Sequence, residues 1–224
     1  MKILEIGFRD GPSLEEGFSA WEGKGTFKRV EFQSPRVFLD STFALKESYD
    51  LVAFFPACSV FSMMSVRHHW RKEIDSWGDS VLLPKSQKAS EALEMLGLMD
   101  QLMSGTRHWF IENPAGTMHK QWTRGNFHRI THCQYGGTRM KPTNIWTSWD
   151  WVSKPSCKYG DPCHPATPRG SRKTGTQTMR TKAERARLPV QLSVDLIESV
   201  FRKILSTEKR ISDALDAGYP ERFR

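Results

Sequence analysis

The pattern that most constrains the fold is a long amphipathic helix between two short apolar runs. The runs, Leu51–Phe55 and His108–Ile111, have the length of strands, and each ends in a turn. Between them, apolar residues recur at helical spacing from Ala89 to Met103, with Ser86 suited to begin the helix and Gly105 to end it. A strand, a helix and a second strand favour parallel pairing. The sequence therefore predicts an α/β fold with a doubly wound, mostly parallel sheet.

Patterns elsewhere in the chain extend this prediction. We expect a first strand over Lys2–Ile6, a helix over Ser13–Trp21, a second strand over Lys28–Phe32 and a last helix over Ser193–Leu205. A chain of 224 residues can form one domain with a core of its own. We divide it into a catalytic and cofactor-binding core (1–147), a basic loop-rich region (148–187) and a C-terminal helix and tail completing the core (188–224).

Positive charge is concentrated in one segment. The formal net charge is +8, and residues 139–187 hold eleven Lys or Arg residues and three acidic ones, so the remaining chain is close to neutral. Such a segment is typical of a surface that follows phosphates, and it predicts a nucleic acid as a partner. Trp146, Trp149 and Trp151 favour this interpretation, because aromatic rings beside cations can stack on exposed bases. The alternative is a solvated loop with no partner. The nucleic-acid-binding candidates are Arg139, Lys141, Arg172, Lys173, Arg180 and Lys182.

Other totals narrow the class of protein. No run approaches 18 uninterrupted apolar residues, so we expect no membrane span. The N-terminus enters directly into a strand pattern rather than a secretory leader, and four cysteines do not make a disulfide framework. We therefore expect a soluble, cytoplasmic protein.

Two reactive side chains follow the two apolar runs. Cys58 comes just after the first run and Glu112 just after the second. The carboxyl ends of neighbouring parallel strands meet at one edge of a sheet, so a thiol and a carboxylic acid there can face the same crevice. A nucleophile and an acid are what covalent addition to an electron-poor ring requires. The alternative for Cys58 is a buried, inert thiol.

Five stretches, taken in order, resemble DNA (cytosine-5) methyltransferases, and in particular the small ones typical of bacteriophages. The matching stretches are Pro56-Ala-Cys58, Glu112-Asn113-Pro114, the pair Cys133–Gly136 and Lys141–Thr147, and Leu188–Leu192. The similarity runs from about residue 2 to about residue 200. It implies a Rossmann-like, class I S-adenosylmethionine-dependent methyltransferase fold, with the target-recognition region reduced to the basic segment.

The resemblance implies transfer of a methyl group to carbon-5 of cytosine in DNA, after the base is flipped out of the duplex. Cys58 would add to carbon-6 and Glu112 would hold and protonate nitrogen-3, with Asn113 as the third catalytic residue. The chain departs from the family where Ala57 replaces a proline and where Lys141 and Asn144 stand in place of an arginine pair. Arg139 and Lys141 could supply that charge. The alternatives are a catalytically inactive relative that binds nucleic acid, and an enzyme that transfers a larger group or acts on RNA.

The implied cofactor is S-adenosylmethionine. A strand, a glycine turn and a helix at the N-terminus make a nucleotide-binding corner, and the second strand ends in an acid. The candidate cofactor-binding residues are Glu5, Gly7, Gly11, Glu31, Asp40 and Pro56. The alternative interpretation of Glu31 is an ordinary surface acid, and that of Asp40 is a residue that forms a turn.

Arg9 is a departure at this corner, because the family has glycine two positions before Gly11. The arginine is compatible with a shifted loop, with a weakened site, or with a modified cofactor that carries extra negative charge.

Two further features stay open. Cys157, Cys163 and His164 are close in sequence and Cys133 could join them, but zinc sites usually present two ligand pairs, so we assign no metal ligands. The segment His68–Leu83 holds Trp70 and Trp77 among charged residues soon after Cys58, and we expect a mobile loop that closes over substrate or a surface loop without a role.

Overall fold

The structure is a computed structural model that describes residues 1–7, 11–31, 49–165 and 181–216, without the side chains of residues 182, 183 and 214–216. Five residues discussed above, and the side chain of Lys182, therefore lie outside the described part; the five are Arg9, Asp40, Arg172, Lys173 and Arg180.

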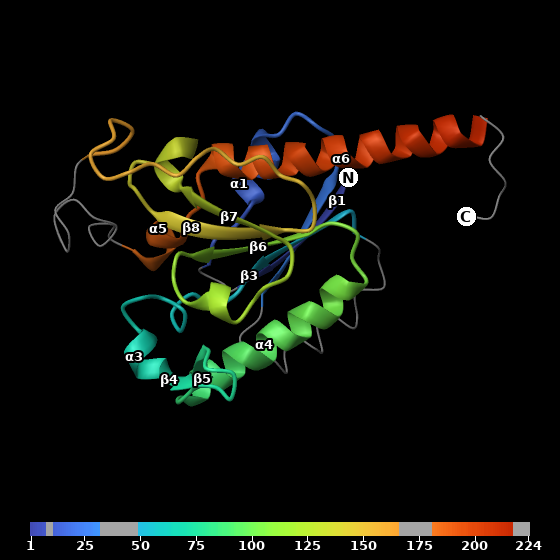
Figure 1. Cartoon of the computed structure of the whole chain (residues 1–224). Coiled ribbons are helices and arrows are strands. Elements are labelled where there is room, and N and C mark those ends of the chain that lie inside the picture. Colours follow the sequence, from blue (N-terminus) through green and yellow to red (C-terminus); the bar gives the residue numbers. More distant parts are fainter. Residues whose placement is uncertain (8–10, 32–48, 166–180, 217–224) are drawn as a thin grey trace.

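A six-stranded sheet in the order β2-β1-β3-β6-β8-β7 forms the centre of the molecule (Figure 1). All neighbouring pairs are parallel except those of β8, which is antiparallel to both of its neighbours. The strands are β1 (Lys2–Gly7), β2 (Thr26–Glu31), β3 (Leu51–Phe55), β6 (Trp109–Pro114), β7 (Asn126–Thr131) and β8 (Pro142–Thr147). The prediction of a doubly wound, mostly parallel α/β sheet is confirmed.

Helices cover both faces of this sheet (Figure 1). On one face, α4 (Gln87–Ser104) packs its buried methionines and Leu96 against Leu4, Ile6, Val52 and Phe54. On the other face, α1 (Glu15–Ala20) and α6 (Val190–Asp216) cover a second core. That core includes Ile3, Leu51, Ala53 and Phe55, so side chains alternate between the two layers along each strand.

The long helix α4 begins as its sequence predicts. The Ser86 side chain accepts a hydrogen bond from the Ala89 amide at 3.3 Å, which satisfies one of the free N–H groups of the first turn. By contrast, α6 is longer than the predicted 193–205. Its buried face ends near Val200, and the helix continues as an exposed, charged rod past the end of the sheet (Figure 1). None of the helices in the described part of the chain is both long and apolar enough to cross a membrane.

The segment after Cys58 is an ordered hairpin, so the expectation of a loop over His68–Leu83 is wrong. A short helix α3 (Val66–His69) leads into β4 (Trp70–Ile74), which pairs with β5 (Ser80–Pro84). The Trp70 indole is buried, donates to the Val60 carbonyl at 2.6 Å and stacks on Phe61 with ring centroids 5.5 Å apart. Apolar packing and this hydrogen bond hold the base of the hairpin on the turn that carries Cys58.

The three tryptophans expected to stack on bases are instead part of the core. Trp146, Trp149 and Trp151 are 1%, 3% and 4% exposed. The Trp149 indole donates to Ser199 and the Trp151 indole to Asp195, both on α6, each at 3.0 Å. The expectation is wrong because these rings have polar partners and apolar neighbours inside the fold.

Candidate active site

The carboxyl ends of β1, β3 and β6 open into a pocket of about 480 Å³. Five residues proposed from the sequence line it, namely Gly11, Pro56, Cys58, Glu112 and Lys141. They come from separate parts of the chain and meet because parallel strands place their carboxyl ends along one edge. The sheet thus brings together the proposed nucleophile, acid and cation.

Cys58 lies on a tight turn directly after β3. The Cys58 carbonyl accepts hydrogen bonds from the Phe61 and Ser62 amides at 3.2 and 3.1 Å, which closes the turn. The side chain is exposed and lines the pocket. The alternative of a buried, inert thiol is therefore wrong.

A second turn, after β6, holds the Cys58 turn in place. Ser62 and Gly116 form a β-bridge, and the Thr117 amide donates to the Phe61 carbonyl at 2.8 Å. A Cβ atom on Gly116 would lie 2.0 Å from the Phe61 carbonyl oxygen, so only glycine permits this approach. The positions of Cys58 and Glu112 are coupled through this contact between the two turns.

Glu112 is a buried carboxylic acid within reach of the pocket. It is 1% exposed, and its Oε1 has no hydrogen-bond partner among the described residues. Burial raises the pKa of the Glu112 carboxyl to about 7, and the positive charge of Lys141 opposes part of that rise. A carboxyl with this pKa is protonated in a large fraction of molecules at neutral pH, so it can donate a proton to a bound ring.

Asn113 links the end of β6 to the end of β3, so its side-chain NH₂ group is not free to bind a ligand in the pocket. Its Nδ2 donates to the carbonyl of Pro56 at 3.2 Å, two residues before Cys58. Its Oδ1 is buried and has no partner in the described part of the chain. Asn113 therefore positions the strand that leads to Cys58.

The predicted cofactor contact of Glu5 is contradicted by its burial. Glu5 is 0% exposed and accepts hydrogen bonds from the Leu14 amide at 2.6 Å and the Ser13 hydroxyl at 3.1 Å, and it pairs with Arg29. Desolvation by burial raises the pKa of Glu5, and its hydrogen bond from Leu14 and the charge of Arg29 oppose the rise. Glu5 supports the start of α1 from inside the fold and cannot touch a ligand directly.

Gly7 and Glu31 end adjacent strands in register. The Glu31 side chain is 44% exposed, and its Oε1 lies 3.4 Å from the Nε of Arg29. A carboxylate at this corner remains accessible to hydroxyl groups of a ligand. Glu31 does not line the pocket that holds Cys58.

The basic candidates separate into two groups. Arg139 and Lys141 line a neighbouring pocket of about 330 Å³ next to the catalytic edge. Lys182 belongs to α5 (Lys182–Ala186), and the other three candidates, Arg172, Lys173 and Arg180, lie outside the described residues.

Reasoning from the sequence missed several pocket residues, and one of them is a cation. Arg185 of α5 and Met140 both line the pocket that contains Cys58. Arg185 falls within the basic segment, but a segment without periodicity gives no signal of which cation turns toward the site. Arg185 reaches the pocket because of where α5 lies in the fold, which the sequence does not reveal.

A second site lies near the end of β7. Cys133, Cys157, Cys163 and His164 place one ligand atom each within 4.8 Å of the others, although we assigned no metal ligands from the sequence because it lacks two ligand pairs. Their spacing of 24, 6 and 1 residues hid this arrangement, since the chain passes through β8 and the buried tryptophans before it returns.

No protein-family profile and no curated protein matches this sequence. Among solved structures, the chain is similar to the methyltransferase EhMeth of Entamoeba histolytica, with 10% identity and a TM-score of 0.40 over 69% of this chain and 55% of that one. It is also similar to a mutant of DNMT2 from Spodoptera frugiperda, with 12% identity and a TM-score of 0.34 over 81% of this chain and 60% of that one. The chain thus spans less than two thirds of either protein. Similarities this distant decide neither substrate nor chemistry, and the proposals below depend on the geometry of this chain.

Proposed function

We propose that this protein transfers a methyl group from S-adenosylmethionine to carbon-5 of cytosine in DNA, through a covalent adduct with Cys58. The observation that carries the proposal is the shared pocket of about 480 Å³, in which an exposed thiol and a carboxylic acid with a pKa of about 7 lie beside a lysine. Cytosine carbon-5 becomes nucleophilic only after addition at carbon-6, and these side chains supply what that addition requires.

The chemistry assigns one role to each side chain. The Cys58 thiolate forms a bond to carbon-6 while the Glu112 carboxyl gives its proton to nitrogen-3, so the ring gains no net negative charge. S-adenosylmethionine, when bound, supplies the methyl group that carbon-5 takes up. Transfer of the carbon-5 proton to solvent then expels Cys58 as its thiolate, and return of the nitrogen-3 proton to Glu112 restores the enzyme.

The corner formed by β1, β2 and β3 fits the cofactor. Gly7 leaves room beside β3, because a Cβ there would already lie 3.3 Å from the Cβ of Phe55. Gly11 and Pro56 line the pocket, and Glu31 is accessible to accept hydrogen bonds from ribose hydroxyls. The methyl donor would then sit between this corner and Cys58.

DNA is the proposed substrate because cations flank the pocket. Arg139, Lys141 and Arg185 surround the catalytic edge, and the sequence continues the positive charge through Arg172, Lys173, Arg180 and Lys182. A base in a duplex cannot reach Cys58, so a double-stranded substrate requires base flipping.

DNA that contains 5-fluorocytosine tests the proposal. Fluorine at carbon-5 blocks the last elimination, so wild-type protein with S-adenosylmethionine should form an adduct that survives denaturation. Peptide mapping of that adduct should find the nucleotide on Cys58. Cys58→Ser should form none, whereas Ser59→Ala, on the same turn, should keep it.

The outcomes separate the alternatives. Attachment at another cysteine, or an adduct that persists in Cys58→Ser, contradicts the proposal. Binding of DNA without adduct or methylated product indicates a catalytically inactive relative. An adduct with RNA alone, or a product nucleoside heavier than 5-methylcytosine, indicates the altered chemistry considered above.

A further inference from the structure

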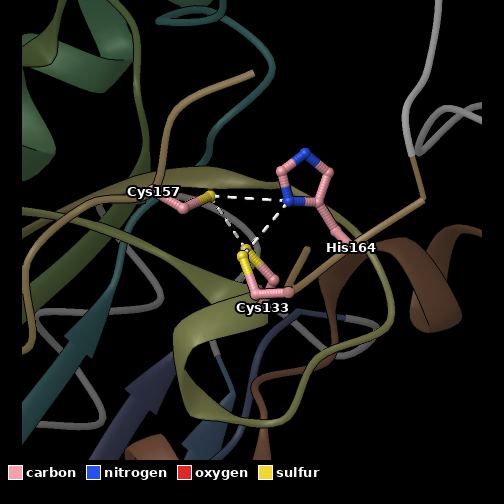
Figure 2. A group of neighbouring side chains, drawn as sticks. Cys133, Cys157 and His164 are labelled. Atoms are coloured by element: carbon pink, nitrogen blue, oxygen red, sulfur yellow. Dashed lines mark hydrogen bonds between the residues drawn. The ribbon is translucent and has the colours of Figure 1, made fainter. Parts of the chain in front are cut away.

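Four potential metal ligands converge at the end of β7, apart from the proposed catalytic pocket. Cys133 lies in η2 (His132–Tyr135), directly after β7, and the other three lie in the segment that follows the buried Trp151. Figure 2 shows Cys133, Cys157 and His164 pointing toward one another. None of the four ligand residues lines the pocket that holds Cys58.

Four of the six separations between these ligand atoms are close to those of a tetrahedral zinc site. Sγ of Cys133 lies 3.1 Å from Sγ of Cys157 and 3.6 Å from Sγ of Cys163. Nδ1 of His164 lies 3.6 Å from Sγ of Cys157 and 3.3 Å from Sγ of Cys163. Tetrahedral zinc with Zn–S bonds of about 2.3 Å requires ligand separations of roughly 3.4–3.8 Å. The other two separations, Cys157–Cys163 and Cys133–His164, are at most 4.8 Å, so modest shifts of these side chains complete the tetrahedron.

The donor set selects the metal. Three sulfur atoms and one imidazole nitrogen, with no carboxylate among them, favour Zn²⁺ over Mg²⁺ or Ca²⁺, which prefer oxygen. Four protein ligands also leave no open position, which is typical of a structural rather than a catalytic zinc. A Cys133–Cys157 disulfide would explain one pair of sulfurs, but it would not explain why Cys163 and the His164 nitrogen lie against the same two atoms.

The protein holds these ligands in place through contacts of its own. The Cys157 amide donates to the Thr131 hydroxyl at 3.0 Å, and the Ser156 hydroxyl donates to the Arg129 carbonyl at 2.6 Å. Cys133, Cys157 and His164 are 7%, 7% and 9% exposed, while Cys163 lies on the open side. The Gln134 amide donates to Sγ of Cys163 at 3.5 Å, a contact suited to a thiolate. The site is thus pre-formed, with one side from which an ion can enter.

We propose that Cys133, Cys157, Cys163 and His164 bind one Zn²⁺ ion, and that this ion fastens residues 157–164 of the basic segment to the end of β7. Binding displaces the protons of the three thiols. The site lies along the same edge of the sheet as Glu112, the edge at which both β6 and β7 end, because these strands run in the same direction on either side of β8. The chain then continues from Pro165 toward Arg169, Arg172, Lys173 and Arg180. A zinc ion here would fix the position of His164, after which this run of cations follows in the sequence.

Metal analysis of the full-length protein tests the proposal without any measure of activity. After purification under reducing conditions without chelator, or after incubation with Zn²⁺ and gel filtration, mass spectrometry of metals should find one zinc per chain. Replacement by Co²⁺ should give the visible bands of a tetrahedral site and the near-ultraviolet absorption of cobalt–thiolate bonds. Cys58→Ser, the matched control, should keep both signals in full.

Variants of the ligands complete the test. Cys163→Ser, at the exposed position, should lower zinc affinity at least about a hundredfold, more than loss of an outer-shell partner costs. His164→Gln should do the same. The proposal is overturned if folded wild-type protein takes up no zinc, if both variants retain a full equivalent, or if a Cys133–Cys157 disulfide persists when reductant and Zn²⁺ are present.

Discussion

The two ends of the sheet use cysteine in opposite ways. In the parallel part, β2-β1-β3-β6, Cys58 stands exposed on a turn beside a carboxylic acid and a lysine. Beyond it, next to β8 and β7, Cys133 and Cys157 are buried and lie 3.1 Å apart, with His164 against them. An exposed thiol surrounded by polar groups is suited to react, whereas thiols gathered around one point are suited to bind a metal. The surroundings of a cysteine, rather than its presence, decide which chemistry is available.

The largest expected effect is on thermal stability. Removal of zinc should lower Tm far more than substitution of Cys58 does. At a thousandfold excess over its dissociation constant, a bound ion stabilises the fold by about 4 kcal/mol, and loss of that contribution should lower Tm by about 10 °C. Cys58→Ser should leave Tm within about 1 °C of wild type, because the side chain is exposed. Calorimetry with and without chelator measures both. An equal loss of Tm in Cys58→Ser would show that the two ends are not separable in this way.

The next effect concerns Glu112 and pH. The pKa of this carboxyl is about 7 in the folded protein because burial disfavours its charged form, against 4.5 for the unfolded chain. Its favourable contribution is therefore complete below about pH 4.5 and is lost as pH rises through about 7, a change of about 3 kcal/mol. Urea unfolding at pH 5 and pH 8 should show this loss in wild type and a smaller one in Glu112→Gln.

The same titration should appear in activity. If the protonated carboxyl serves nitrogen-3, the rate of methyl transfer should fall as pH rises above about 7, and Glu112→Gln should lack that limb of the profile. Identical pH dependences of stability in wild type and Glu112→Gln would contradict the burial argument. A rate that increases through pH 9 in wild type would instead contradict the role as acid.

The smallest expected effect lies between the two ends, at Arg139. Arg139→Ala should lower the salt slope of DNA binding by about 0.9, the value for one phosphate contact, with similar loss for unrelated sequences. Titrations of one duplex at several salt concentrations measure the slope. Arg202→Ala is the control, because Arg202 pairs with Glu198 on the exposed surface of α6. Parallel slopes for Arg139→Ala and wild type would remove Arg139 from the DNA-binding surface.

Local patterns are sufficient to predict the parallel part of the molecule. The strand Leu51–Phe55 and the start of α4 after Ser86 agree with the structure, because the signal for each lies within a few neighbouring residues. The meeting of Cys58 and Glu112 in one pocket follows from the direction of parallel strands. Glu5 was misassigned because a sequence does not reveal whether an acid at a strand end faces a ligand or the interior.

The other end of the sheet depends on contacts that no local pattern records. β7 is mostly exposed and polar, so its sequence carries no period of two. The tryptophans beside it were interpreted as surface rings because cations follow them in sequence, yet α6, some fifty residues on, provides Trp149 with its partner. The four ligands likewise come from separate segments that the sheet brings together, so their spacing in the chain does not resemble two pairs.

The hairpin after Cys58 carries a tryptophan whose intrinsic fluorescence can be separated from that of the core. Trp77, between β4 and β5, is 88% exposed, whereas the other seven tryptophans are 8% exposed or less. Emission at long wavelength, and quenching by acrylamide, should therefore come almost entirely from this one ring. Trp77→Phe would supply the background spectrum. A change in the quenchable fraction when DNA is added would then register events at the hairpin alone, while the buried rings would continue to report whether the core is intact.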